Sequence, residues 1–185
     1  MIKISYALLV VLISFLWLLS RFLVWRKQGF IHWKRELALL FVYVCIVVVA
    51  RFTFFPFSKV NGQIQPLVFD PAQVFPPRVN LLPIVYLLDY PEQREALLNL
   101  IGNTAMFVPL GIVWPIVYSR LNTPLKAIGA GFGFSLFIEI LQLPFYDRVS
   151  DIDDLILNTT GFIIGYVLYR LVKAMVTWLA KRLAT

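Results

Sequence analysis

Three groups of polar side chains lie within or beside apolar stretches of this sequence. Asn99 and Asn103 are four residues apart, and Glu139 and Gln142 are three apart, so each pair shares a face of a helix. The third group begins in a loop with Arg148 and Asp151 and continues with Asp154 and Asn158, which are four residues apart on one helical face. Amides and an arginine can hydrogen-bond the polar head of a ligand, whereas carboxylates can orient the arginine or hold a hard divalent cation.

The composition is that of a membrane protein rather than a water-soluble one. Of 185 residues, 60% are hydrophobic, against about 45–50% in a typical soluble domain. Only 15% are charged, which excludes a disordered chain. A single cysteine, Cys45, excludes a disulfide framework and a cysteine-based zinc site, and a single histidine, His32, excludes a two-histidine metal motif.

Five apolar runs are long enough to cross a membrane, which takes about 20 residues each. They predict helices at residues 4–24, 37–55, 97–118, 127–143 and 156–172. The first is expected to be a retained helix and not a cleaved signal peptide, because Arg21, Arg26 and Lys27 follow the run instead of preceding it. We therefore predict an all-α, polytopic integral membrane helix bundle that forms a single membrane domain over residues 1–185.

Basic residues predict the orientation of the chain in the cell membrane, because those in short loops stay cytoplasmic. Eleven Lys and Arg residues fall on one side of the predicted spans and five on the other. This asymmetry predicts an extracytoplasmic N-terminus, a long extracytoplasmic loop at residues 56–98, and a basic cytoplasmic tail at residues 173–185. The net charge of +7 is then an orientation signal that also attracts anionic inner-leaflet lipid, and no nucleic-acid partner is expected. Residues 167–183 are expected to leave the bilayer as a basic interfacial helix.

With this topology, the three polar groups and Arg51 of the second span lie in the outer half of the membrane. Polar residues at that depth are costly and mark functional sites, so we predict that they converge on one outward-facing polar pocket. Structural roles remain open: the asparagines can join helices by hydrogen bonds, Glu139 can form an ion pair with Arg148 or Arg51, and the aspartates can cap the fifth helix. Four glycines are expected to serve close helix packing: Gly102, Gly111, Gly161 and Gly165.

Two ordered motifs resemble those of the VanZ-like membrane protein family. The main motif is Glu139, Gln142, Arg148, Asp151, Asp154, Asn158, Gly161 and Gly165. The other is Asn99, Gly102, Asn103, Phe107, Pro109, Leu110 and Gly111. The resemblance covers about residues 47–169 and leaves residues 1–25 as an additional N-terminal transmembrane helix. It implies a multi-helix membrane protein in a family named for a member associated with low-level resistance to teicoplanin, a lipid-tailed glycopeptide antibiotic. It brings no catalytic residues.

Two functional readings remain. In the first, the protein is non-enzymatic, and the pocket binds a lipid-linked cell-wall precursor or a lipoglycopeptide antibiotic beside membrane lipid. In the second, it is an intramembrane enzyme in which Glu139, Asp151 and Asp154 hold a divalent cation and Arg148 meets a phosphate; outside this alternative no cofactor or metal is expected. The first is favoured, because no histidine, cysteine nucleophile or phosphate-binding glycine loop lies near these residues. A transporter is less consistent with five spans that lack an evident inverted repeat. Ligand identity and oligomeric state cannot be read from the sequence.

Overall fold

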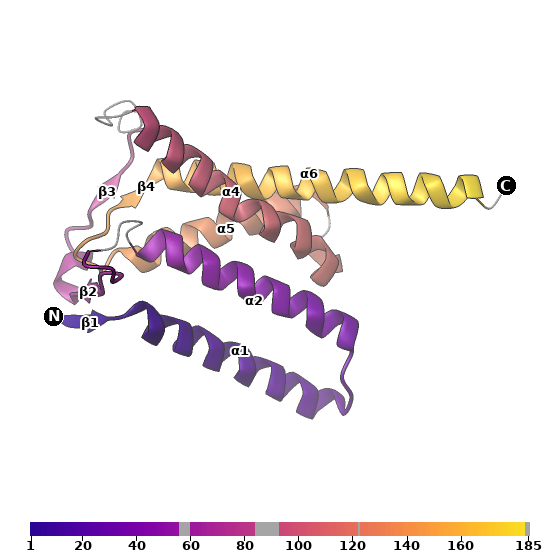
Figure 1. Ribbon diagram of the computed structural model, residues 1–185, viewed down its shortest axis with the longest axis horizontal. Coiled ribbons are helices and arrows are strands. Elements are labelled where there is room, and N and C mark those ends of the chain that lie inside the picture. The colour runs from indigo at the N-terminus through magenta and orange to yellow at the C-terminus, as the bar shows by residue number, and fades with distance from the viewer. Residues whose placement is uncertain (56–59, 84–92, 122, 184–185) are drawn as a thin grey trace. The chain divides into compact units, whose positions relative to one another are not determined.

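The computed structural model describes residues 1–55, 60–83, 93–121 and 123–183. Five helices in these ranges are long and apolar enough to cross a membrane, which confirms the predicted all-α membrane fold (Figure 1). They are α1 (Tyr6–Gln28), α2 (Trp33–Phe54), α4 (Gln93–Val117), α5 (Pro124–Gln142) and α6 (Ile152–Leu183). The chain divides into two compact units: unit 1 comprises Met1–Leu82 with Phe137–Ile152, and unit 2 comprises Pro83–Leu136 with Asp153–Thr185.

Helices α1 and α2 of unit 1 form a hairpin and lie side by side (Figure 1). Ser5 caps the start of α1 by accepting a hydrogen bond from the backbone N–H of Leu8. Gly29 ends the helix in the left-handed conformation, with φ of 73°, which glycine adopts without steric cost. An ion pair joins the two helices, with Arg21 Nε 3.0 Å from Glu36 Oε2.

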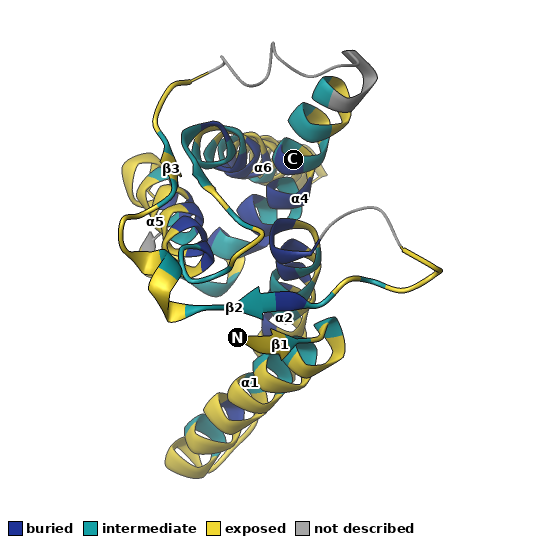
Figure 2. Ribbon diagram, turned by 90° about the vertical axis from the view of Figure 1, so that its left-hand side faces the viewer, coloured by how far each residue is buried: buried dark blue, intermediate teal, exposed yellow. Residues whose placement is uncertain are grey.

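Most of the surface of α1 is exposed, as Figure 2 shows. Its exposed side chains are largely leucine, valine and phenylalanine, which are suited to contact lipid. Helix α2 is more buried than α1, and Val49, Phe54 and Phe55 near its C-terminal end belong to the core of the protein. The second span therefore supports the packing of unit 1.

Short strands organise the loops of unit 1. Strand β1 (Ile2–Ile4) pairs antiparallel with β2 (Leu67–Phe69), and β3 (Val79–Asn80) pairs in parallel with β4 (Ser150–Asp151). A single 3-10 turn, η1 (Pro71–Val74), follows β2. The pairing of β1 with β2 places the long loop at the same end of unit 1 as the N-terminus, in agreement with the predicted order of the spans. The side of the membrane on which this loop lies stays a prediction.

Helices α4 and α6 of unit 2 pack closely against each other. At Gly161 and Gly165 of α6, an added Cβ would meet the carbonyl oxygens of Thr104 and Val108 in α4. At Gly111 of α4, it would meet the carbonyl oxygen of Phe162. These positions rise together along both helices, so α4 and α6 run in the same direction, as the third and fifth spans of a membrane protein must. The small residues allow the two backbones to approach closely.

Helix α6 is longer than the sequence predicted. It runs without interruption over 32 residues, Ile152–Leu183, whereas the predicted fifth span was 156–172 and a separate interfacial helix was expected to follow. No glycine or proline occurs between Gly165 and the end of α6, so no residue in this part of the helix favours a break.

Replacing Gly161 or Gly165 by alanine should destabilise unit 2, because each new methyl group would meet a backbone carbonyl oxygen that has little freedom to move. We expect the free energy of unfolding in detergent micelles to fall by about 1–3 kcal/mol. Gly129→Ala is the matched control, because an added Cβ there meets nothing within 4 Å, and it should be neutral or stabilising by up to about 1 kcal/mol. Equal losses at all three positions would show that these glycines do not set the distance between α4 and α6.

Candidate functional site

The C-terminal end of α2 is buried in unit 1. Thr53, Phe54 and Phe55 are all buried. The last carbonyl groups of a helix, however, receive no hydrogen bond from the helix backbone. Thr53 uses its own hydroxyl within the helix, where Oγ1 donates to the carbonyl of Val49 at 2.9 Å. Donors for the carbonyls at the end of α2 must therefore come from side chains, because the helix backbone has none to offer.

Three predicted site residues supply these donors. Gln142 Nε2 donates to the Thr53 carbonyl at 2.8 Å, and Arg148 Nε donates to the Phe54 carbonyl at 3.0 Å. Arg51 NH1 donates to the Phe55 carbonyl at 3.2 Å. Arginine is well suited to this position, because a positive charge at a helix C-terminus is stabilised by the helix dipole. Gln142 and Arg148 thereby fasten the segment after α5 to the end of α2.

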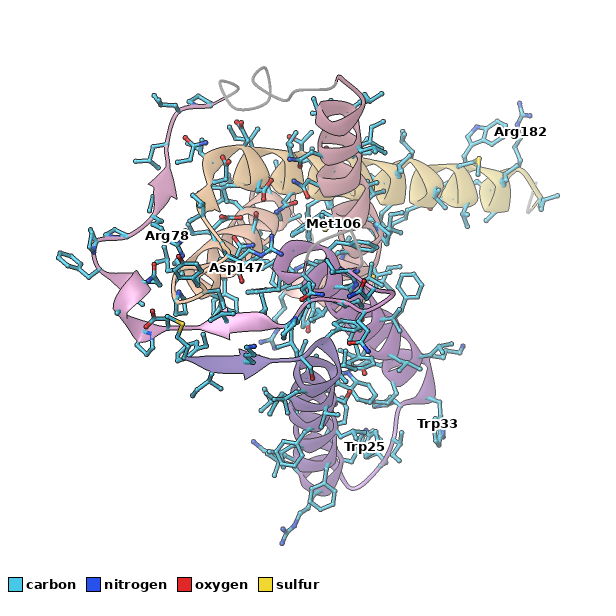
Figure 3. The ribbon with its side chains drawn as sticks, turned by 60° about the vertical axis from the view of Figure 1, so that its left-hand side comes forward. Trp25, Trp33, Arg78, Met106, Asp147 and Arg182 are labelled. Carbon is cyan, nitrogen blue, oxygen red and sulfur yellow. The ribbon has the colours of Figure 1, made fainter. Side chains whose placement is uncertain are left out.

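Residues 143–149, between α5 and β4, are held by the long loop of unit 1. The backbone N–H of Asp70 donates to the Pro144 carbonyl at 2.8 Å, and that of Tyr146 donates to Val68 at 2.9 Å. Arg78 NH2 and NH1 donate to the carbonyls of Phe145 and Tyr146 at 2.7 and 2.5 Å (Figure 3). Arg78 is not among the predicted site residues, because a loop arginine gives no sequence signal for binding backbone carbonyls.

Glu139 fixes the other end of this segment. Its Oε2 atom accepts the backbone N–H of Asp151 at 2.8 Å and the hydroxyl of Ser150 at 3.1 Å. Asp151 in turn accepts a hydrogen bond from Asn80 Nδ2 at 3.1 Å, which reinforces the pairing of β3 with β4. Glu139 is buried, and a buried carboxylate needs hydrogen-bond partners. The Asp151 N–H and the Ser150 hydroxyl supply two of them.

A second polar cluster lies in unit 2, where α4 and α6 begin. Asn103 Nδ2 donates to Asn99 Oδ1 at 2.6 Å, and it also donates to Asp154 Oδ1. Asn103 is buried, and the other two side chains are partly exposed. The cluster links α4 to α6 through hydrogen bonds, which is the structural role that remained open for the asparagines.

Asn158 lies one turn further along α6 and is 1% exposed. Its Nδ2 atom lies 3.1 Å from Oγ of Ser135 in α5, and Ser135 is fully buried. Within the described ranges, the Oδ1 atom of Asn158 has no hydrogen-bond partner. Ser135 is a site-lining residue that the sequence did not single out, because a lone serine in an apolar helix is common.

The predicted site residues thus fall into two sets. Unit 1 gathers Arg51, Glu139, Gln142, Arg148 and Asp151, and unit 2 gathers Asn99, Asn103, Asp154 and Asn158. Convergence of all nine on one pocket stays a prediction. Among the residues that the structure describes, no three His, Cys, Asp or Glu side chains are grouped so that they could hold a metal ion. The metal-dependent alternative therefore has no geometric observation in its favour.

Comparison with known proteins gives one match. The model of the family described as VanZ/LLP1 matches residues 39–173, a segment that contains both sequence motifs and the predicted core of residues 47–169. No curated protein and no solved structure matches the chain.

Replacing Glu139 by alanine should destabilise unit 1, because it leaves the Asp151 N–H and the Ser150 hydroxyl without this acceptor. We expect a loss of about 2–4 kcal/mol in the free energy of unfolding, measured by denaturation in detergent micelles. Glu139→Gln keeps an oxygen in place and should lose less than half as much. Asp147→Ala removes an exposed carboxylate and should change stability by less than about 0.5 kcal/mol. If Glu139→Ala behaves like Asp147→Ala, Glu139 does not hold this segment.

Proposed function

This chain belongs to the VanZ/LLP1 family of VanZ-like membrane proteins, and we propose that it is a non-enzymatic protein that binds the polar head of a lipid-linked or lipid-tailed ligand. The ligand approaches from the extracytoplasmic side, as the distribution of basic residues predicts. Its tail remains among the apolar helices. The strongest support for binding comes from Gln142.

Gln142 has a buried acceptor that no residue in the described part of the chain uses. The side chain is 3% exposed, and its Nε2 atom donates to the Thr53 carbonyl. Because a carbonyl can only accept, this bond fixes the orientation of the amide and identifies the other atom as Oε1. Oε1 is buried without a hydrogen-bond partner among the residues that the structure describes. Such an unsatisfied group destabilises a protein by about 1–3 kcal/mol, and a bound ligand that donates to it would remove this cost.

The free acceptor indicates the chemistry of the ligand. It calls for a hydroxyl, an amide N–H or an ammonium group as donor. In unit 2, the unpartnered Oδ1 of Asn158 is an acceptor of the same kind. Both cell-wall precursors and glycopeptide antibiotics carry sugars and peptides, which are rich in such donors, together with a lipid tail that concentrates them at the membrane. This match favours an amphiphile of that class over a simple anion.

Binding of this kind gives a route to antibiotic resistance. A protein that covers the head of the lipid-linked cell-wall precursor lowers the access of a glycopeptide to its target, and one that holds the lipid-tailed antibiotic keeps it from that target. Neither route requires bond cleavage. Both are consistent with the association of the family's namesake with low-level teicoplanin resistance.

Gln142→Met tests this proposal, because methionine has a similar length and lacks the amide. We expect binding of teicoplanin, or of a polyprenyl-linked cell-wall precursor, to weaken by about threefold to tenfold, the effect of losing one hydrogen bond. Binding would be measured by fluorescence with full-length protein in nanodiscs. Gln73→Met is the matched control, because the Gln73 amide is partly exposed and its Nε2 already donates to Asp70, so its affinity should equal that of the unaltered protein.

Stability must be measured alongside affinity, because Gln142→Met also removes the donor to Thr53. Binding is therefore compared at a temperature well below the unfolding midpoint of both variants. Unchanged affinity of a folded Gln142→Met variant for both ligands would exclude Gln142 from the binding site.

A further inference from the structure

Two hollows in unit 2 meet at Arg170 of α6. The first is an apolar groove of about 300 Å³ between the start of α5 and α6, lined mainly by Pro124, Ile128, Ile163, Val167 and Leu171, with Arg170 at its edge. The second, of about 590 Å³, runs along α6 from Arg170 through Lys173, Thr177 and Trp178 to Lys181. An apolar groove that continues into a basic hollow has the polarity pattern of a phospholipid.

The spacing of residues explains the basic hollow. Each of its lining residues lies three or four positions from another along α6, from Arg170 to Lys181, so they share one helical face. Val172, Val176 and Leu179 occupy the opposite face and are exposed. The last third of α6 is thus amphipathic, with cations on one side and apolar side chains on the other.

The length of α6 places Arg170 near a membrane boundary. The hydrocarbon core of a bilayer takes about 20 helical residues. Helix α6 carries Asp153 and Asp154 in its first turn, and these charged residues favour a position at the other membrane boundary, opposite Arg170. Counting about 20 residues from Ile152 reaches Val172. Arg170 and Lys173 therefore lie at the depth of lipid phosphates, and Trp178 is of the type enriched at that interface.

Arg170 is positioned so that its guanidinium group can bind a ligand. Its NH1 atom donates to the hydroxyl of Tyr166 at 3.0 Å, and Tyr166 is buried beside the apolar groove. Arginine has five N–H donors and matches phosphate geometry, so this bond leaves the exposed part of the guanidinium able to bind an anion. No acidic residue follows Asp154 in the sequence, so no carboxylate along the rest of α6 competes for the cations.

We propose that this region is a binding site for one anionic phospholipid, with an acyl chain in the groove along Val167 and the phosphate on Arg170 and Lys173. The site lies apart from Asn158, the residue of unit 2 that the proposed function uses. Arg170 lies 12 residues beyond Asn158 along α6, or about 18 Å at 1.5 Å per residue.

Native mass spectrometry of the full-length protein tests this site. The protein would be equilibrated with equal amounts of phosphatidylglycerol and phosphatidylcholine that carry the same acyl chains. We expect phosphatidylglycerol to be retained preferentially, and Arg170→Gln with Lys173→Gln should lower that preference by about fivefold or more, the usual effect of a cation at an anionic surface. Val167→Trp, which fills the groove, should reduce retention of both lipids.

Arg182→Gln is the matched control, because Arg182 is a cation of the same helix that lines neither hollow and stacks on Trp178 (Figure 3). It should keep the preference within twofold of the unaltered protein. Equal retention of the two lipids, or an equal loss in Arg182→Gln, would overturn the proposal. Normal lipid retention in Val167→Trp, or displacement of the lipid by inorganic phosphate, would also overturn it. A change of oligomeric state in Val167→Trp would overturn it as well, because it would show that a second copy of the chain occupies the groove.

Discussion

The carbonyl groups at the end of α2 impose the main constraint on unit 1. They are buried, and the helix cannot supply donors to them. The protein meets this requirement with side chains, because Gln142, Arg148 and Arg51 each donate to one carbonyl of Thr53, Phe54 or Phe55. Two of these donors flank residues 143–147, so the end of α5 and the following loop must dock where α2 ends.

The same requirement gives the motif residues a structural role beside any role in binding. Glu139 accepts the Asp151 N–H, and Arg78 binds the carbonyls of Phe145 and Tyr146. These contacts hold the polar side chains of unit 1 in defined positions, as a binding site requires. Gln142 uses its Nε2 atom for structure, and its Oε1 atom has no partner among the described residues. The proposed function rests on that second atom.

The large features of the fold follow from the sequence because the bilayer requires about 20 apolar residues for each crossing. For α5, the predicted 127–143 compares with Pro124–Gln142. The hydrogen bond between Asn99 and Asn103 also follows from helical spacing. The partners of Gln142 and Arg148 do not, because every residue carries a backbone carbonyl and the sequence cannot indicate which one a distant side chain will reach. Strands of two or three residues, such as β3 and β4, give too short a pattern to recognise.

The capping of α2 by Gln142 can be measured directly by solid-state NMR of the full-length protein in lipid bilayers, with ¹⁵N in glutamine side chains and ¹³C in threonine carbonyls. A weak but measurable dipolar coupling between the Gln142 side-chain nitrogen and the Thr53 carbonyl carbon is expected, because Nε2 lies 2.8 Å from the carbonyl oxygen. The coupling should disappear in Gln142→Met. Absence of the coupling in the unaltered protein would contradict the arrangement of unit 1 around the end of α2.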